Sequence, residues 1–423
     1  MNKYNSWNIT TITVLVSIII CAASTASGSG FAVYTQGASA LGQGNAATAH
    51  ADDPTAIFYN PALINKLDGT QIALGTTLII SSRTFDSAQT GKTFETDNDI
   101  FYPSTLYITH KLNDKFSAGL GVFSPFGLGT DWGEDWEGRY ITTKSELQTF
   151  NINPAVSYRV IPGISVAAGM DILLVDATLE KKIKLSPLPD AGQKFQGDGT
   201  GIGYNLGVLF DLGKDISFGA SYRSDIKVDI DGDATFTLPQ GVPPQVAALL
   251  QNSPGKTDIT FPQQVHAGIH YKGFDPLTLE IGMRWEGWSS FDQLTISLDN
   301  GQTSVTKRNW KDVFAYNIGA RYRLNDTATM LAGYLYGESP VSDDTFDPSI
   351  PDANTHVFSV GTDLDYKKFK VALAYAYQMF ESRTKNNTVG DPPPPVPPVT
   401  IDRANGTYDS SLHMVGVSLV YKF

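Results

Sequence analysis

From about residue 70 onward, apolar and polar residues alternate with a period of two in one segment after another. In the segment 369–383, for example, Phe369, Val371 and Leu373 alternate with Lys370 and Ala372. Successive side chains of a β-strand point to opposite faces of the sheet, so each segment has one apolar face and one small or polar face. The pattern predicts an all-β protein.

Three features favour a transmembrane barrel over a soluble β-sandwich, which shows the same alternation. Many segments run for roughly ten to fifteen residues, whereas strands of globular proteins average about five or six. The apolar faces carry Tyr, Phe and Trp near the segment ends, as in the aromatic girdles of membrane barrels. The opposite faces carry Arg, Lys, Asp and Glu, which a packed core does not hold unpaired. A lipid-facing exterior around a polar lumen accommodates all three.

We expect a transmembrane antiparallel β-barrel of about 14 strands, an even number as in bacterial single-chain barrels. Short turns such as 112–115 alternate with longer connections, which mark the periplasmic and the outer end respectively. The last strand ends on Phe423, an aromatic terminus typical of outer-membrane barrels. The predicted strands are 70–85, 101–112, 115–124, 143–160, 163–184, 197–212, 215–237, 257–272, 275–298, 309–323, 327–338, 355–367, 369–383 and 407–423.

Two segments precede the barrel. Residues 1–28 are predicted to be a secretory signal, with Lys3, an apolar stretch from Ile9 to Ala23, and small residues up to a cleavage site after Ala26 or, by preference, Gly28. Residues 29–68 are rich in Ala, Gly and Asn and lack strand periodicity. Because a barrel of this size holds water unless something fills it, we expect them to form an N-terminal hatch (plug) inside the lumen. The barrel itself is assigned to 69–423.

Composition argues against several other classes of protein. The chain has 31 Lys+Arg against 43 Asp+Glu, a formal net charge of −12, which disfavours a nucleic-acid partner. No run of about 18 apolar residues predicts a membrane-spanning helix. The single cysteine, Cys21, falls in the predicted signal, so no disulfide framework is expected.

Signals of an enzyme are weak, and we expect no catalytic activity, no cofactor and no metal site. His266 and His270 are four residues apart, which on a strand separates them by roughly 13 Å, too far to share a metal ion. No credible grouping of a serine, a histidine and an acidic residue is visible.

Several short motifs occur in a characteristic order along the chain. They are Ser29-Gly30-Phe31, Gly42 with Gly44, Asp52-Asp53-Pro54, Asn60-Pro61-Ala62, Trp136-Glu137-Gly138-Arg139-Tyr140, Asn153-Pro154-Ala155, Ser221-Tyr222-Arg223-Ser224, Trp310-Lys311-Asp312, and Ser339-Pro340-Val341 leading to Ile350-Pro351-Asp352. In their order and spacing, over essentially the whole mature chain, the sequence resembles the FadL-type outer-membrane transporters of long-chain fatty acids and other hydrophobic compounds.

The resemblance implies a monomeric 14-stranded barrel in the outer membrane of a Gram-negative bacterium. Its expected surroundings are outer-membrane lipid and lipopolysaccharide, and the barrel-assembly machinery is its expected partner in biogenesis. A hydrophobic ligand is expected to bind first in an outer-loop groove and then in a lumen pocket. It then leaves sideways through a gap in the wall at a kinked third strand. Transport is passive.

The expected site residues fall into three groups, each with a plainer alternative. Pro125, Gly127 and Gly129 disturb the third strand, because proline cannot donate to a ladder and glycine weakens it; the alternative is a simple strand end. Asn60, Pro61 and Ala62 match the family's hatch motif, or form a plain turn before the first strand. Ligand capture is assigned to Phe123, Phe126, Trp132, Trp136, Leu249 and Leu250, some of which suit an aromatic girdle equally well.

A carboxylate head group requires a basic partner. Lys311 matches a lysine that the family's fatty-acid transporters place near the head group. Where those members carry an arginine on the fifth strand, this chain has Asp176, which would repel a carboxylate and is therefore a candidate substrate selector. Arg223, Arg284, Arg321 and Arg323 are alternatives, although lumen arginines are more often paired with wall carboxylates such as Glu280 and Glu286.

The sequence thus predicts a passive outer-membrane channel for hydrophobic molecules, foremost long-chain fatty acids. Two alternatives stay open. One is uptake of aromatic hydrocarbons or alkanes by the same fold, motivated by Asp176. The other is an open porin for small polar solutes, against which the hatch-like residues 29–68 argue.

Overall fold

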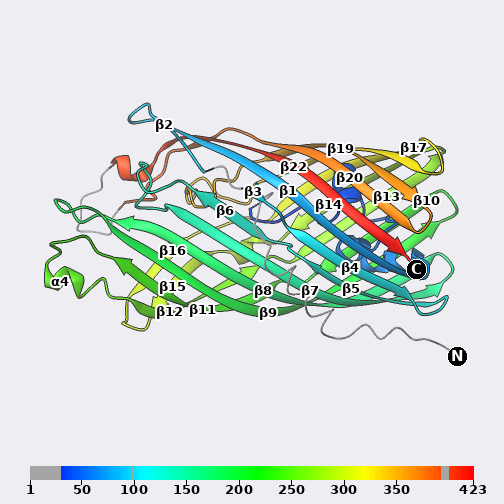
Figure 1. The fold of residues 1–423 in the computed structure, drawn as a ribbon, viewed down its shortest axis with the longest axis horizontal. Helices are drawn as coiled ribbons and strands as arrows, with labels where there is room; N and C mark the ends of the chain where they lie inside the picture. Colours follow the sequence, from blue (N-terminus) through cyan, green and yellow to red (C-terminus); the bar gives the residue numbers. More distant parts are fainter. Residues whose placement is uncertain (1–29, 98–99, 392–399) are drawn as a thin grey trace.

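The computed structural model describes residues 30–97, 100–391 and 400–423. The predicted signal, residues 1–28, lies outside the described residues. The described chain forms a long barrel of oblique antiparallel strands around one lumen (Figure 1). Short turns and the C-terminus lie at one end, on the right of Figure 1, and the longer connections lie at the other.

The strands begin and end as follows: β1 Thr70–Ser87, β2 Thr93–Glu95, β3 Ile100–Phe101, β4 Ser104–Lys111, β5 Phe116–Phe123, β6 Gly127–Asp131, β7 Lys144–Ile161, β8 Ile164–Ile183, β9 Ala191–Leu212, β10 Ile216–Arg223 and β11 Ile226–Thr237. They continue with β12 Ser253–Phe261, β13 Gln264–Phe274, β14 Leu277–Glu286, β15 Gln293–Leu298, β16 Thr303–Lys307, β17 Val313–Arg323, β18 Ala328–Gly337, β19 Thr355–Tyr366, β20 Phe369–Phe380, β21 Arg383–Lys385 and β22 Gly406–Lys422. The short helices are α2 Ala38–Gly42, α3 Ala56–Tyr59, η1 Pro61–Lys66, α4 Pro244–Ala247, η2 Trp288–Ser290 and η3 Thr400–Arg403.

The sheet closes on itself because its first and last strands pair. β1 and β22 are antiparallel neighbours from Gln71 opposite Lys422 to Ser87 opposite Gly406. Several wall strands are interrupted and consist of two consecutive segments, such as β5 with β6 and β10 with β11. Counted by wall strand, the described residues form the closed antiparallel barrel of 14 strands that the sequence predicted.

The two faces of the wall also agree with the prediction. In β20, Phe369 and Leu373 are 46% and 41% exposed, whereas Lys370 and Ala372 are buried. Apolar side chains therefore cover the exterior and small or polar ones line the lumen, as a barrel in lipid requires. None of the helices in the described part of the chain has the length and apolarity needed to cross a membrane.

Residues 30–67, here called the N-terminal segment, lie in the lumen near the end with the short turns (dark blue in Figure 1) and are almost entirely buried. α2 packs against β18, β19, β20 and β22, whereas η1 packs against β5, β7, β8 and β9. One short segment therefore contacts two different arcs of the wall, which requires a position inside the barrel. The assignment of 29–68 as a separate hatch stays a prediction.

Candidate functional site

The wall is interrupted in its third strand, between β5 and β6. β5 pairs with β4 as far as Val122 opposite Leu106, whereas β6 pairs with β7 alone among the strand ladders of the described residues. Pro125 lies in the interruption, and Gly127 and Gly129 follow it in β6. The three residues predicted at the kink therefore lie where the ladder to the preceding strand is lost. Their use as a ligand exit remains a prediction.

The N-terminal segment covers this interruption with its own backbone. Val33 N donates to Pro125 O at 2.9 Å, and Gly127 N donates to Phe31 O at 2.7 Å. Nearby, the ring of Phe101 lies so close to Gly129 that a Cβ atom there would come within 2.4 Å of it. The backbone of the N-terminal segment and the ring of Phe101 therefore fill the interruption.

Asn60 holds the start of η1 and ties it to the wall. Its Oδ1 accepts a hydrogen bond from Ala62 N at 3.1 Å, and Pro61 occupies the first helical position, where no backbone donor is needed. Its Nδ2 donates to Val208 O in β9 at 2.9 Å. The predicted hatch motif therefore contacts β9, while the preceding Phe58 faces the third strand, with its ring centroid 5.2 Å from that of Phe123.

Five aromatic rings surround that of Phe31, and the six together are here called the aromatic cage. The ring of Phe31 lies between 4.5 Å (Trp288) and 6.2 Å (Phe126) from those of its five neighbours, and every member is almost fully buried. The cage consists of Phe31, Phe126, Phe261, Trp288, Phe291 and Trp310. It is an apolar site beside the wall interruption, and a side chain of the N-terminal segment fills its centre.

Sequence reasoning had identified only Phe126 of the cage as a ligand-facing residue. Trp288 follows Gly287, which ends the alternation of β14, so the face to which the tryptophan points cannot be deduced from strand phase. The motif Ser29-Gly30-Phe31 was the available signal for Phe31.

Trp132 and Trp136, which the sequence assigned to ligand capture, are not accessible at the surface of the outer loops. They are 5% and 1% exposed, and their rings stack on each other at 4.7 Å. Their indole nitrogens donate to Pro348 O and Thr142 O, so both are core residues of the outer loops. Leu249 is 61% exposed and lies beside the turn between β15 and β16, where Gln302 Nε2 donates to Leu249 O at 2.8 Å; Leu250, next to it, is partly buried.

Lys311 and Trp310 are neighbours in the chain but lie in different surroundings. Trp310 is buried in the aromatic cage, whereas Lys311 is exposed and lines an outer cavity of about 510 Å³. Arg383, Asp343 and Glu381 line the same cavity, which is therefore polar and carries both signs of charge. The structure places Lys311 at the outer surface rather than in the aromatic cage.

Asp176 does not face the lumen, and this corrects the expectation of a substrate selector there. Along β8, Leu173, Val175 and Ala177 are buried, whereas Leu174 and Asp176 are exposed. Asp176 therefore shares the exterior face with Leu174, because alternate residues of a strand lie on one side. A ligand inside the barrel does not meet its carboxylate.

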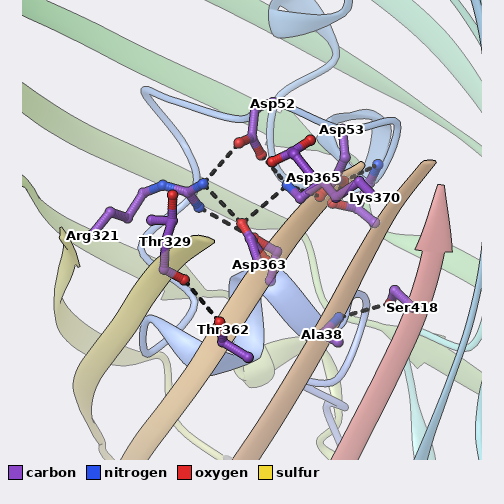
Figure 2. A network of polar contacts seen from close by, with 12 residues as sticks. Ala38, Asp52, Asp53, Arg321, Thr329, Thr362, Asp363, Asp365, Lys370 and Ser418 are labelled. Carbon is purple, nitrogen blue, oxygen red and sulfur yellow. Dashed lines mark hydrogen bonds and ion pairs between the residues drawn. The ribbon is translucent and has the colours of Figure 1, made fainter. Parts of the chain in front are cut away.

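A buried charge cluster ties the N-terminal segment to the wall at the end with the short turns (Figure 2). Arg321 Nη2 lies 2.7 Å from Asp52 Oδ2 and 2.9 Å from Asp363 Oδ2. Lys370 Nζ lies 2.5 Å from Asp52 Oδ1, 3.1 Å from Asp363 Oδ2 and 3.4 Å from Asp53 Oδ2. The motif Asp52-Asp53 is visible in the sequence, whereas its partners Arg321 and Lys370 lie more than 260 residues further along the chain.

The electrostatics of the N-terminal segment follow from these contacts. Burial raises the pKa of Asp52, yet Arg321 and Lys370 outweigh it and hold this pKa well below its ordinary value. Next to it, the imidazole of His50 stacks on that of His270 at 4.4 Å. Burial, followed by the charge of Arg321, lowers the pKa of His50 to about 3. At neutral pH the segment is therefore docked with an ionised Asp52 and a neutral His50.

Comparisons with known proteins agree with this architecture. Residues 19–423 match a family model described as outer membrane protein transport protein (OMPP1/FadL/TodX). The chain is similar to the long-chain fatty acid transport protein of Escherichia coli O6:H1, with 27% identity over 347 residues, 74% of this chain and 77% of the relative. It is also similar to the 47 kDa outer membrane protein of Pasteurella multocida, with 25% identity over 378 residues, 83% of this chain and 87% of the relative.

Solved structures share the fold. The crystal structure of a Pseudomonas aeruginosa FadL homologue superposes with a TM-score of 0.82 at 19% identity, covering 93% of this chain and 100% of the homologue. The crystal structure of the P. putida toluene transporter TodX superposes with a TM-score of 0.70 at 17% identity, covering 92% of this chain and 98% of the transporter.

Proposed function

The chain belongs to the outer membrane protein transport family (OMPP1/FadL/TodX), whose members are outer-membrane channels for hydrophobic compounds, and we propose that it takes up long-chain fatty acids by passive diffusion. The observation that carries the proposal is the aromatic cage. It is an apolar site in the lumen, it lies beside the wall interruption, and Phe31 of the N-terminal segment occupies its centre.

The proposed route has three stages. A ligand is captured among the outer loops, where Leu249 and the outer cavity next to Lys311 are accessible. It then displaces Phe31 and enters the aromatic cage. Finally it leaves sideways between β4 and β6, where Phe31 and Val33 had covered the wall. In this scheme the N-terminal segment, with Asn60, Pro61 and Ala62, acts as the hatch.

The energetics favour a sideways exit for an acyl chain. Each buried CH₂ contributes about 0.8 kcal/mol relative to water. A path from an apolar cage into membrane lipid keeps most of this energy throughout, whereas an exit along the axis would hydrate the whole chain. No energy source is needed, because the ligand moves down its own gradient.

Fatty acids are preferred over hydrocarbons for two reasons. Relatives at 25–27% identity, over 74–75% of this chain, are named long-chain fatty acid transport proteins. In addition, the hydrocarbon alternative was motivated by Asp176, and that residue lies on the exterior. An open porin is disfavoured because buried residues 30–67 fill part of the lumen.

The test is mass spectrometry of organic extracts from the purified protein, together with titrations with oleate and with toluene. A co-purified fatty acid that oleate displaces is the expected result. Binding of toluene without binding of oleate would refute the fatty-acid assignment and favour the hydrocarbon alternative. Steady ion conductance of the intact protein in planar bilayers would refute the hatch and favour a porin.

We also propose, from the family, that the barrel is monomeric, that lipid and lipopolysaccharide surround it, and that the barrel-assembly machinery inserts it. The exposed apolar side chains of β20 and β22, such as Leu373 and Val417, support contact with lipid.

A further inference from the structure

Of the four arginines that were alternatives for a ligand head group, three are matched by carboxylates at short range. Arg223 pairs with Asp171, Arg321 with Asp52 and Asp363, and Arg323 with Asp275. A guanidinium that already holds a carboxylate in this way has little left to offer a ligand. These three are therefore poor candidates for a head-group site.

Arg284 differs from them. Its side chain is 11% exposed, and in its ion pair with Glu286 the Nη2 and Oε2 atoms lie 3.5 Å apart. Neither Nε nor Nη2 of Arg284 makes a hydrogen bond within the described residues, and Glu286 Oε2 makes none either. Buried donors are normally satisfied, and a charged donor left unsatisfied is especially unfavourable. Two buried nitrogen atoms of Arg284 are thus available to donate to an acceptor.

These donors border a small cavity in the lumen. Arg284, His266, Asn317 and Leu335 line it from the wall, and residues of the N-terminal segment, including Tyr34 and Phe58, line it from within. The cavity measures about 20 Å³, enough for a water molecule but not for a carboxylate with its chain. The ring of Tyr34 covers the guanidinium, with its centroid 3.8 Å from Arg284 Cζ. Displacement of the N-terminal segment would therefore enlarge the cavity and uncover Arg284.

The same displacement would open the aromatic cage. Phe31, at the centre of the cage, is three residues before Tyr34, and Trp288 of the cage is four residues after Arg284. Movement of one short piece of chain would thus expose both an apolar site and a cation, since Phe31 and Tyr34 lie on the same segment. That combination matches the polarity of a long-chain carboxylate.

We infer that Arg284 binds the carboxylate of the ligand in the lumen while the acyl chain lies in the aromatic cage. This inference rests on the proposed uptake of fatty acids and deepens it, because it assigns the head-group site to a residue of the wall inside the barrel. Glu286 competes with the ligand for the guanidinium, which makes the site selective for an acceptor able to form direct charge-assisted hydrogen bonds.

The experiment compares oleate with oleyl alcohol, which has the same chain without a charge, in equilibrium binding to the purified full-length protein. For Arg284→Gln we expect oleate affinity to fall by about tenfold or more, in line with a lost hydrogen bond to a charged group. Affinity for oleyl alcohol should stay unchanged. Arg323→Gln makes the same chemical change at an arginine that is paired at an exposed turn, and it should change neither affinity.

A second variant tests the inference in the opposite direction. Glu286→Gln removes the competing carboxylate, so it should strengthen oleate binding and leave oleyl alcohol unaffected. Oleate affinity equal to wild type in folded Arg284→Gln would overturn the inference, with folding checked by the shift of the unheated barrel on gel electrophoresis. If Arg284→Gln does not fold, the inference would be overturned by a Glu286→Gln variant whose oleate affinity is no higher than that of wild type. Wild-type protein that binds neither ligand would instead refute the proposed function.

Discussion

The buried charge cluster predicts how firmly the N-terminal segment is held, and Lys370→Met is the sharpest perturbation. Lys370 is completely buried and lies within 3.4 Å of oxygen atoms of Asp52, Asp53 and Asp363. Methionine has a similar length and no charge. The substitution leaves three carboxylates facing the single cation of Arg321, two of them on the N-terminal segment.

The size of the effect follows from the burial of the cluster. Removing one partner of a buried ion pair costs about 3–5 kcal/mol, because the remaining charge has no compensation. The segment itself carries Asp52 and Asp53, so it can recover this energy by leaving the lumen and hydrating both carboxylates. The ratio of docked to undocked segment should then fall by roughly 150-fold to 4,000-fold.

The assay is conductance of single barrels in planar bilayers, since a 14-stranded barrel without a plug is wide enough to hold water. Lys370→Met should show frequent ion-conducting openings that wild type shows rarely. Lys422→Met is the matched control, because Lys422 pairs with Asp365 at 3.3 Å on the same side of the barrel but is partly exposed. Such a pair is worth little, about 0–1 kcal/mol, so this variant should resemble wild type. Conductance of folded Lys370→Met equal to that of Lys422→Met would refute the reasoning.

Three further predictions follow from the same geometry. Phe31→Ala should lower the free energy that holds the N-terminal segment in the lumen by about 3–5 kcal/mol, the usual cost of losing a buried phenylalanine ring. It should also raise oleate affinity, because the ligand no longer has to displace the ring. Weaker oleate binding would contradict this. Asp176→Arg should leave oleate affinity within about twofold of wild type, in the range of surface substitutions, because residue 176 faces the exterior; a large gain in a titration would contradict it. Docking of the segment should weaken as the pH falls from about 6.5 to about 3. Burial holds the pKa of His50 at about 3 in the docked state, whereas the imidazole of the undocked segment binds a proton near its ordinary pKa of 6.5, so acid favours the undocked state. Conductance measured across this range should therefore rise on acidification in wild type and rise less in His50→Gln.

The barrel could be predicted from the sequence because the face of each wall residue depends only on its near neighbours in the strand. A wall residue faces either lipid or the lumen, and successive residues of a strand alternate between the two. The faces of Phe369 and Lys370 therefore follow from their own polarity and that of their neighbours in the chain. The interruption at Pro125 was equally local, since proline lacks the backbone donor that a ladder needs.

The candidate site was predictable only in part. Asn60, Pro61 and Pro125 were identified by type and lie close to the wall interruption or tie the N-terminal segment to the wall. Asp176 lies on the opposite face from the one that the family resemblance implied, and its alternation with Val175 and Leu174 shows this. In a strand, a shift of one residue reverses every side chain. The burial of Trp132 and Trp136 could not be predicted, because the packing of loops cannot be deduced from their composition.

The alternation along the chain therefore specified the strands, their number and their two faces, because each depends on neighbouring residues alone. Closure of the barrel decided which distant groups meet. Asp52 lies more than 260 residues before Arg321 and Lys370, and only the stacking of strand registers around the lumen brings them together. The same registers place Arg284 beside a cavity, with Glu286 at 3.5 Å, whereas Arg223, Arg321 and Arg323 each lie closer to a carboxylate. Such pairings depend on the registers of all the strands together, so they cannot be deduced from a local pattern of residues.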